Sequence, residues 1–231
     1  MSLAERLKVE TRPLHVDVER SALIAALLRG RLDRHAYLAL LQNLQAIYAA
    51  LEPALRRHAA HPALAPFDLD ALVRGAALAA DIAMLDDDSV EAAGRAPLEP
   101  ATIEYVDRLA HLDRCAPELL VAHAYVRYLG DLNGGQLLGR IVRNALGLPP
   151  ASGTAFYDFG EVPGVAVLAA RFRSALDRSA LSDANAVVAE AKAAFQRHRN
   201  VFDELARRLG VGSEPSATRT GEPPMRRTAD S

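Results

Sequence analysis

Hydrophobic residues recur along this chain with the spacing of α-helices. Between residues 37 and 55 they follow one another at intervals of three or four, which places them on one buried helical face. No segment alternates apolar and polar residues as a half-buried strand does. The pattern therefore predicts an all-α fold. The residues on this face are Tyr37, Leu41, Leu44, Tyr48, Leu51 and Leu55.

Capping residues and helix breakers divide the chain into separate helices. Ser2 followed by Glu5 is typical of a capping box, and Asp33 is a favourable N-cap. Gly147, with two prolines beyond it, is a stop signal. Pro13 lies inside the first helix, where it can cause a kink. The expected helices, the last capped by Ser182, span about residues 2–28, 33–55, 68–85, 101–113, 117–146, 164–178 and 183–209.

Composition agrees with a helical, single-domain protein. Ala and Leu dominate, and both lose little conformational entropy in a helix. The 231 residues suit one domain. We expect residues 1–209 to form this domain. Residues 210–231 are polar and proline-rich without any period, so we expect a disordered tail there.

Charge and cysteine content narrow the function and the location. The net charge of −2 gives no indication of nucleic-acid binding. The single cysteine, Cys115, excludes an intrachain disulfide and a cysteine-based metal site. The N-terminus has no apolar signal core, and no apolar run reaches the roughly 18 residues of a spanning helix. We expect a monomeric, cytoplasmic protein with no membrane anchor.

Four glycines stand within the stretch from Tyr125 to Gly139. Each glycine inside a helix costs about 1 kcal/mol relative to alanine, so another interaction must offset them. Gly130 and Gly134 are four residues apart and share one face, where the missing side chains let a flat ligand touch the backbone. The alternative is close helix packing through small residues. The four glycines are Gly130, Gly134, Gly135 and Gly139.

Asp131 lies beside this glycine face, in an otherwise apolar helix. A carboxylate there is costly unless it is hydrogen-bonded. Asp131 is either a local cap at a helix break or an acid that organises water over a reacting ligand. The presence of Asp131 favours contact with a ligand over close helix packing as the role of the glycines.

A second candidate face lies on the first helix. Lys8, Arg12, His15 and Glu19 follow one another at intervals of four, three and four. A neutral imidazole is a natural axial ligand of haem iron. Lys8 is about 10.5 Å from His15 along the axis, within reach of a haem propionate. Glu19 is placed to fix the tautomer of His15. The alternative is a solvated, charged face.

Three segments together resemble the haem oxygenase family. The stretch LKVETRPLHVDVE (residues 7–19) is similar to its proximal helix. The stretch LLVAHAYVRYLGDLNGGQLLGRI (119–141) is similar to its distal helix, and EAKAAFQRHRNVFDEL (190–205) to its last core helix. The resemblance covers about residues 2–209. It implies a multi-helix bundle that holds haem between the proximal helix and a distal helix kinked at its glycines.

The resemblance also implies roles for individual residues. On the proximal side they would bind the iron, support its ligand and hold the propionates. On the distal side they would contact the haem face and hold a water network. The implied proximal and propionate residues are His15, Glu19, Lys8, Tyr125 and Arg173. The implied distal residues are Gly130, Gly134, Asp131, Arg127 and Tyr48.

Three positions depart from the family pattern. Ala169 stands where a second basic partner for the propionates is expected, and Pro13 is unusual inside the proximal helix. His198 stands where some relatives have an asparagine. These departures concern how haem is seated, and therefore which meso carbon is attacked.

The implied activity is oxidative cleavage of haem b, which is both cofactor and substrate. Molecular oxygen is the co-substrate, and a reductase or ferredoxin supplies the electrons. The implied products are biliverdin, carbon monoxide and ferrous iron. Arg12, Lys8 and Arg173 would lie near the exposed haem edge, which favours an acidic electron donor.

Three other functions compete with this interpretation. A haem-storage protein on the same fold would not need an organised acid such as Asp131. A di-iron bundle needs Glu-x-x-His pairs, and the sequence has none. A purely structural bundle would leave the cost of the glycines unexplained.

Overall fold

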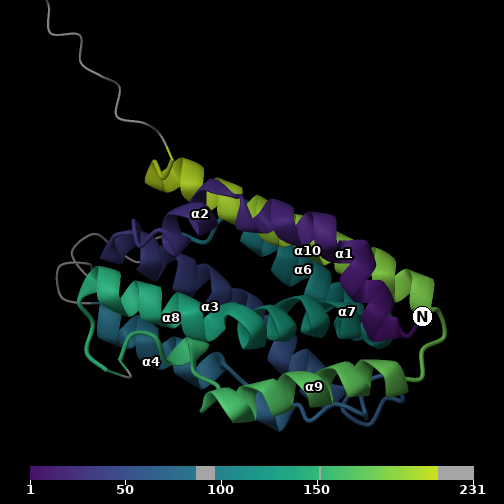
Figure 1. The fold of residues 1–231 in the computed structure, drawn as a ribbon. Helices are drawn as coiled ribbons and strands as arrows, with labels where there is room; N and C mark the ends of the chain where they lie inside the picture. Colours follow the sequence, from purple (N-terminus) through teal and green to yellow (C-terminus); the bar gives the residue numbers. More distant parts are fainter. Residues whose placement is uncertain (87–96, 151, 213–231) are drawn as a thin grey trace, which may run out of the picture.

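The computed structural model describes residues 1–86, 97–150 and 152–212. This part of the chain is helical and contains no strand, as predicted. Figure 1 shows the helices packed around one core. They are α1 (Leu3–Glu19), α2 (Ala22–Leu28), α3 (Arg34–Arg57), α4 (Gly75–Leu85), α6 (Pro100–Cys115), α7 (Leu120–Ala124), α8 (Gly130–Leu146), α9 (Val162–Arg178) and α10 (Ala184–Leu209).

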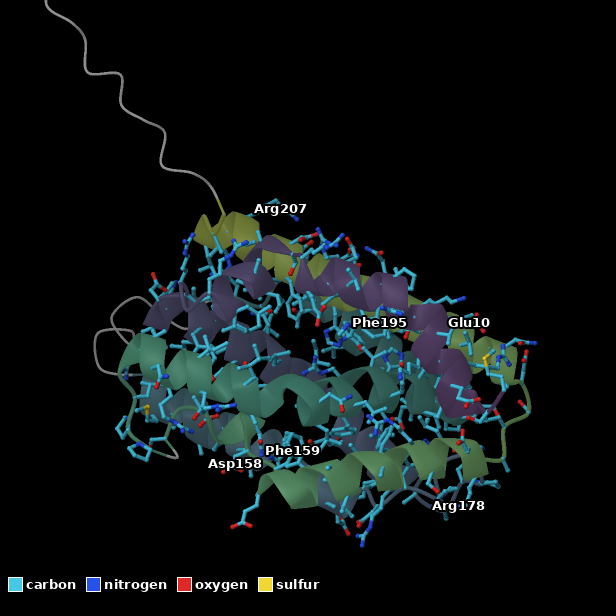
Figure 2. All side chains as sticks on the ribbon, in the orientation of Figure 1. Glu10, Asp158, Phe159, Arg178, Phe195 and Arg207 are labelled. Atoms are coloured by element: carbon cyan, nitrogen blue, oxygen red, sulfur yellow. The ribbon has the colours of Figure 1, made fainter. Side chains whose placement is uncertain are left out.

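The central helix is α3, which packs against α4, α6, α7 and α10. Every residue from Ala36 to Leu44 is buried, so α3 is covered on more than the one face that its periodicity predicted. Helix α1 lies along α10 (Figure 1). Lys192 Nζ of α10 lies 2.8 Å from Glu10 Oε2 of α1, and Glu10 is labelled at this junction in Figure 2. Helix α9 contacts both α1 and α8.

The first helix is divided in two, whereas the sequence predicted one helix up to Leu28. Helix α1 begins at the predicted capping box of Ser2 and Glu5 and continues through Pro13 to Glu19. Ser21 then accepts a hydrogen bond from the backbone N–H of Ile24 and caps α2. The serine hydroxyl competes for a backbone donor, which explains the break.

Local caps elsewhere were predicted correctly, and a distant one was missed. Asp33 caps α3, and Gly147 ends α8 in the left-handed conformation with φ +62°. Helix α4 begins only at Gly75, after a 3-10 turn at residues 70–72, although the sequence predicted a helix from residue 68. The carboxylate of Glu52, on α3, accepts from the backbone N–H of Arg74 and Gly75, so the cap of α4 comes from another helix.

Two further boundaries differ from the expectation. Asp183, and not Ser182, caps α10, because its carboxylate accepts from the backbone N–H of Asn185 and Ala186. The predicted long helix 117–146 is interrupted. It consists of a 3-10 turn at Pro117–Leu119, then α7, a π-helical turn and α8. Most of the predicted tail, residues 213–231, lies outside the described residues.

Candidate functional site

A π-helical turn, Tyr125–Leu129, separates α7 from α8. A π turn accommodates an extra residue, bends the helix locally and often occurs at functional sites. It ends directly before Gly130, so the interruption lies in a segment that contains no glycine, whereas the kink was expected at the glycines. Arg127 lies in the middle of this turn, and its side chain reaches Asp131 in the first turn of α8.

The four glycines of this segment form two pairs with different surroundings. A Cβ added at Gly130 or at Gly134 would meet no atom within 4 Å. A Cβ at Gly135 would lie 3.3 Å from the backbone oxygen of Tyr157, and one at Gly139 would lie 3.2 Å from the Cβ of Tyr157. Close packing, one of the two alternatives from the sequence, therefore applies to Gly135 and Gly139, whereas Gly130 and Gly134 form an open face.

The open face adjoins a buried polar cluster of Tyr48, Arg127 and Asp131. Arg127 Nη2 donates to both carboxylate oxygens of Asp131, at 3.0 and 3.3 Å, and Arg127 Nε donates to Tyr48 Oη at 3.2 Å. The hydroxyl of Tyr48 in turn donates to Asp131 Oδ2. These three residues, each at most 9 % exposed, thus close a ring of hydrogen bonds.

Electrostatics keep Tyr48 protonated and Arg127 charged near neutral pH. Burial raises the pKa of Asp131 above its ordinary value, while Arg127 and Tyr48 oppose the rise. Burial also raises the pKa of Tyr48, so its hydroxyl stays protonated as a donor. Burial lowers the pKa of Arg127, but Asp131 and Tyr48 outweigh it and raise the pKa overall. Arg127 therefore remains a cation beside Asp131.

His15 lies on α1, with about half of its side chain exposed (48 %). Its Nδ1 is 3.6 Å from Glu19 Oε1, and its ring meets the ring of Phe195 edge-on at 5.8 Å. Figure 2 labels Phe195 on α10, close to α1. The contact with Glu19 uses Nδ1 and leaves Nε2 available for a ligand. The predicted pairing of His15 and Glu19 is therefore present in the fold.

One hydrogen bond joins the face of His15 to the glycine segment. Thr11 Oγ1 of α1 lies 3.2 Å from the hydroxyl of Tyr125 at the start of the π turn. Beyond this contact His15 follows Thr11 by four residues on α1, and Gly130 follows Tyr125 by five along the other segment. His15 and Gly130 thus each follow this contact by about one helical turn, one on each segment.

The three expected propionate residues have different surroundings. Arg173 Nη2 on α9 donates to Asn133 Oδ1 on α8 at 3.1 Å. Burial raises the pKa of Tyr125, while Thr11 and the charge of Arg173 lower it, so Arg173 acts on Tyr125. Lys8 is exposed and forms no hydrogen bond or ion pair with any described residue. The structure therefore brings Tyr125 and Arg173 together and leaves Lys8 separate.

Sequence reasoning missed several residues that build this site. Thr11 is buried and lies four residues before His15, a spacing that would have identified it. Tyr157 packs on the back of α8, and Asp81 holds its turn by accepting from the backbone N–H of Ala155 and Phe156. No local pattern connects these residues, because they come from three separate parts of the chain.

Comparisons with known proteins agree with this architecture. A family model described as Heme oxygenase matches residues 1–204. Heme oxygenase 1 of Nostoc sp. strain PCC 7120 is 34 % identical over 206 residues, covering 88 % of this chain and 86 % of the relative. The heme oxygenase of Porphyra purpurea is 39 % identical over 209 residues, with the same coverage of the two chains.

Solved structures give the same result. Heme oxygenase-2 of Synechocystis sp. PCC 6803, in complex with heme and NO, superposes with a TM-score of 0.84 at 34 % identity. The match covers 92 % of this chain and 88 % of that one. No helix within the described ranges is long and apolar enough to cross a membrane. On the family model, the relatives and the shared fold, the chain belongs to the haem oxygenase family, whose members cleave haem to biliverdin.

Proposed function

We propose that the open face of Gly130 and Gly134, beside the buried Tyr48–Arg127–Asp131 cluster, is where this chain oxidises haem. The cluster is the observation that carries the proposal. Its acid is held by two partners within the fold and stands at an edge where glycines leave the backbone uncovered. A storage site gains nothing from so constrained a carboxylate.

His15 would bind the iron, and haem b is the proposed form of the cofactor. Nε2 of His15 is available, and Glu19 near Nδ1 favours the tautomer that would leave Nε2 as the ligand atom. Lys8, Tyr125 and Arg173 are proposed to hold the propionates. Arg173 already binds an amide oxygen of Asn133, and a carboxylate would be a stronger partner for its guanidinium.

The chain's own residues direct the reaction by placing a hydrogen-bond donor. Haem, when bound, supplies the iron that binds O2 and the macrocycle that is cleaved. Asp131 has lone pairs beyond those used by Arg127 and Tyr48, so it can accept a hydrogen bond from a water. That water then points its second hydrogen towards the open face of Gly130. Small glycines next to it leave room for the ligand.

Electrons must come from another protein, which we propose to be a reductase or a ferredoxin with an acidic surface. Lys8 and Arg12 are exposed on α1, and neither forms an ion pair with a described residue. Opposite charge on the donor would steer it to this edge. We further propose that the chain acts as a monomer in the cytoplasm.

The assignment of His15 is tested by His15→Ala, with the exposed His111→Ala as the matched control. We expect His111→Ala to bind haem with the absorption and electron-paramagnetic spectra of the wild type. His15→Ala should lose the signature of histidine-ligated iron, and added imidazole should restore it. An unchanged spectrum in His15→Ala would assign the iron to another histidine.

A further inference from the structure

A cleft of about 780 Å³ lies between α2, the first turn of α3 and the C-terminal end of α10. Figure 1 shows α2 beside this end of α10. None of the residues proposed to contact haem lines the cleft, so it is separate from the haem face. Ligand pockets in proteins have volumes of about 300–1,000 Å³, so the cleft has room for a cofactor-sized molecule.

Part of the cleft is apolar and consists of small side chains. Ala25 and Ala26 follow Ala22 by three and four residues, so all three lie on one side of α2. Val211, just beyond the end of α10, also lines the cleft. The chain passes close to α2 there, since a Cβ added at Gly212 would lie 3.0 Å from the Cβ of Ala22. The cleft therefore offers an apolar surface on which the body of a ligand can pack.

Three arginines line the same cleft. Arg20 lies between α1 and α2, Arg29 is the C-cap of α2, and Arg31 follows in the turn before α3. All three are exposed, and none of their side chains forms a hydrogen bond or an ion pair with a described residue. The only acid among the described lining residues is Asp33, which accepts from the backbone N–H of Ala36. The cleft is therefore positively charged, and its guanidinium groups have no anion to bind within the described ranges.

This combination defines the chemistry of the ligand. A guanidinium group binds a carboxylate through two parallel N–H donors. Several arginines around an apolar surface fit a molecule that carries more than one carboxylate on an apolar body. Biliverdin, which members of this family form from haem, is such a molecule. It keeps both propionates of haem on an open-chain, largely apolar tetrapyrrole.

We propose that the arginine-lined cleft is a second tetrapyrrole site, which binds biliverdin after it leaves the haem face. Two of the arginines hold the propionates, and the alanines of α2 contact the tetrapyrrole. The choice of biliverdin rests on the proposed function, whereas the affinity of the cleft for an apolar dicarboxylate does not. Because the two sites share no lining residue, biliverdin binds the cleft while haem occupies its own site.

The proposal is tested by titrating biliverdin into the full chain loaded with one equivalent of ferric haem, without a reductant. Biliverdin fixed in a protein site acquires circular dichroism in its red absorption band, and we expect this signal to saturate at one equivalent. Arg29→Gln and Arg31→Gln should each weaken binding roughly tenfold, because each removes a charged hydrogen bond. Arg114→Gln, on an exposed arginine of α6, is the matched control and should bind as the wild type does.

A second pair of variants separates a built site from attraction by surface charge. Ala25→Phe fills the cleft and keeps every arginine, so it should abolish the signal, whereas Ala79→Phe, on exposed α4, should not. The Soret band reports haem binding separately, so a failure of the haem site is distinguished from a failure of the cleft. A wild type without a saturable signal would overturn the proposal, as when residues 213–231 or a second copy fill the cleft. Wild-type affinity in both arginine variants, or in Ala25→Phe, would place biliverdin elsewhere and also overturn it.

Discussion

Asp131 follows Gly130 in the chain, and the two residues illustrate opposite ways of building a site. Gly130 contributes by having no side chain, since a Cβ there would meet no atom within 4 Å. Asp131 contributes a carboxylate that Arg127 and Tyr48 hold in place. The pairing of Asp131 with Arg127 can be predicted from the sequence, because the two residues are four apart and side chains at this spacing meet on a helix. The partnership with Tyr48 requires the fold.

The two glycine pairs predict opposite responses to an added methyl group. Gly134→Ala meets open space and gains helix propensity of about 1 kcal/mol, so its free energy of unfolding should rise while haem binding weakens. Gly135→Ala drives its Cβ against the backbone of Tyr157, and overpacking costs about 1–3 kcal/mol, so the protein should be less stable. Urea unfolding without haem and haem titration check both. Equal effects of the two variants would contradict the division of the glycines.

At the scale of the elements, the sequence predicted a helix boundary correctly where the capping residue adjoins the helix that it caps. Asp33 and Gly147 were read correctly because each acts on its own helix. The start of α4 was missed because Glu52, more than twenty residues earlier, supplies its cap. The π turn was not predicted either, since Tyr125 to Leu129 reads as an ordinary helix and the bend depends on packing around it.

Acid pH should loosen the junction of α6, α7 and α10 through Glu190. Burial raises its pKa, but hydrogen bonds from His123 and Arg108 outweigh burial and lower the pKa from the ordinary value of 4.5 to about 2. A lowered carboxyl pKa contributes stability above the ordinary value and loses it as the pH falls towards 2. We therefore expect Glu190→Gln to flatten the fall in the free energy of unfolding between pH 4.5 and 2, measured by urea unfolding.

The control for this measurement is Glu104→Gln, an exposed glutamate on α6. In this variant the free energy of unfolding should fall with pH as in the wild type, because Glu104 does not contribute to the lowered pKa of Glu190. A wild-type slope in Glu190→Gln would mean that the ion pair with Arg108 does not stabilise the folded state.

For the whole molecule, helical periodicity was enough to predict the fold class, and resemblance was needed for the site. Glu190 and His123 are 67 residues apart and meet only because α10 packs on α7. Tyr48 reaches Asp131 from a helix 83 residues away. Such contacts leave no local pattern. The family resemblance grouped Tyr48 with Asp131, and the fold brings these two side chains into contact.

The charge on the exposed side of α1 predicts how the molecule meets its electron donor. Arg12→Glu should slow reductase-supported turnover several-fold at low salt, and the difference should shrink as salt screens the surface. Turnover supported by ascorbate, which needs no docked protein, should stay at the wild-type rate. The same loss with ascorbate would place Arg12 in haem binding and not in docking.

The central claim is that the Asp131 cluster directs the oxidation of haem at the glycine face. The most direct measurement follows the Soret band and the products when O2 and ascorbate are added to haem-loaded wild type and Asp131→Ala. The wild type should bleach and yield biliverdin. Asp131→Ala should bind haem with His15 still as the ligand, form no biliverdin and gain peroxidase activity. Normal biliverdin formation by Asp131→Ala would contradict the account.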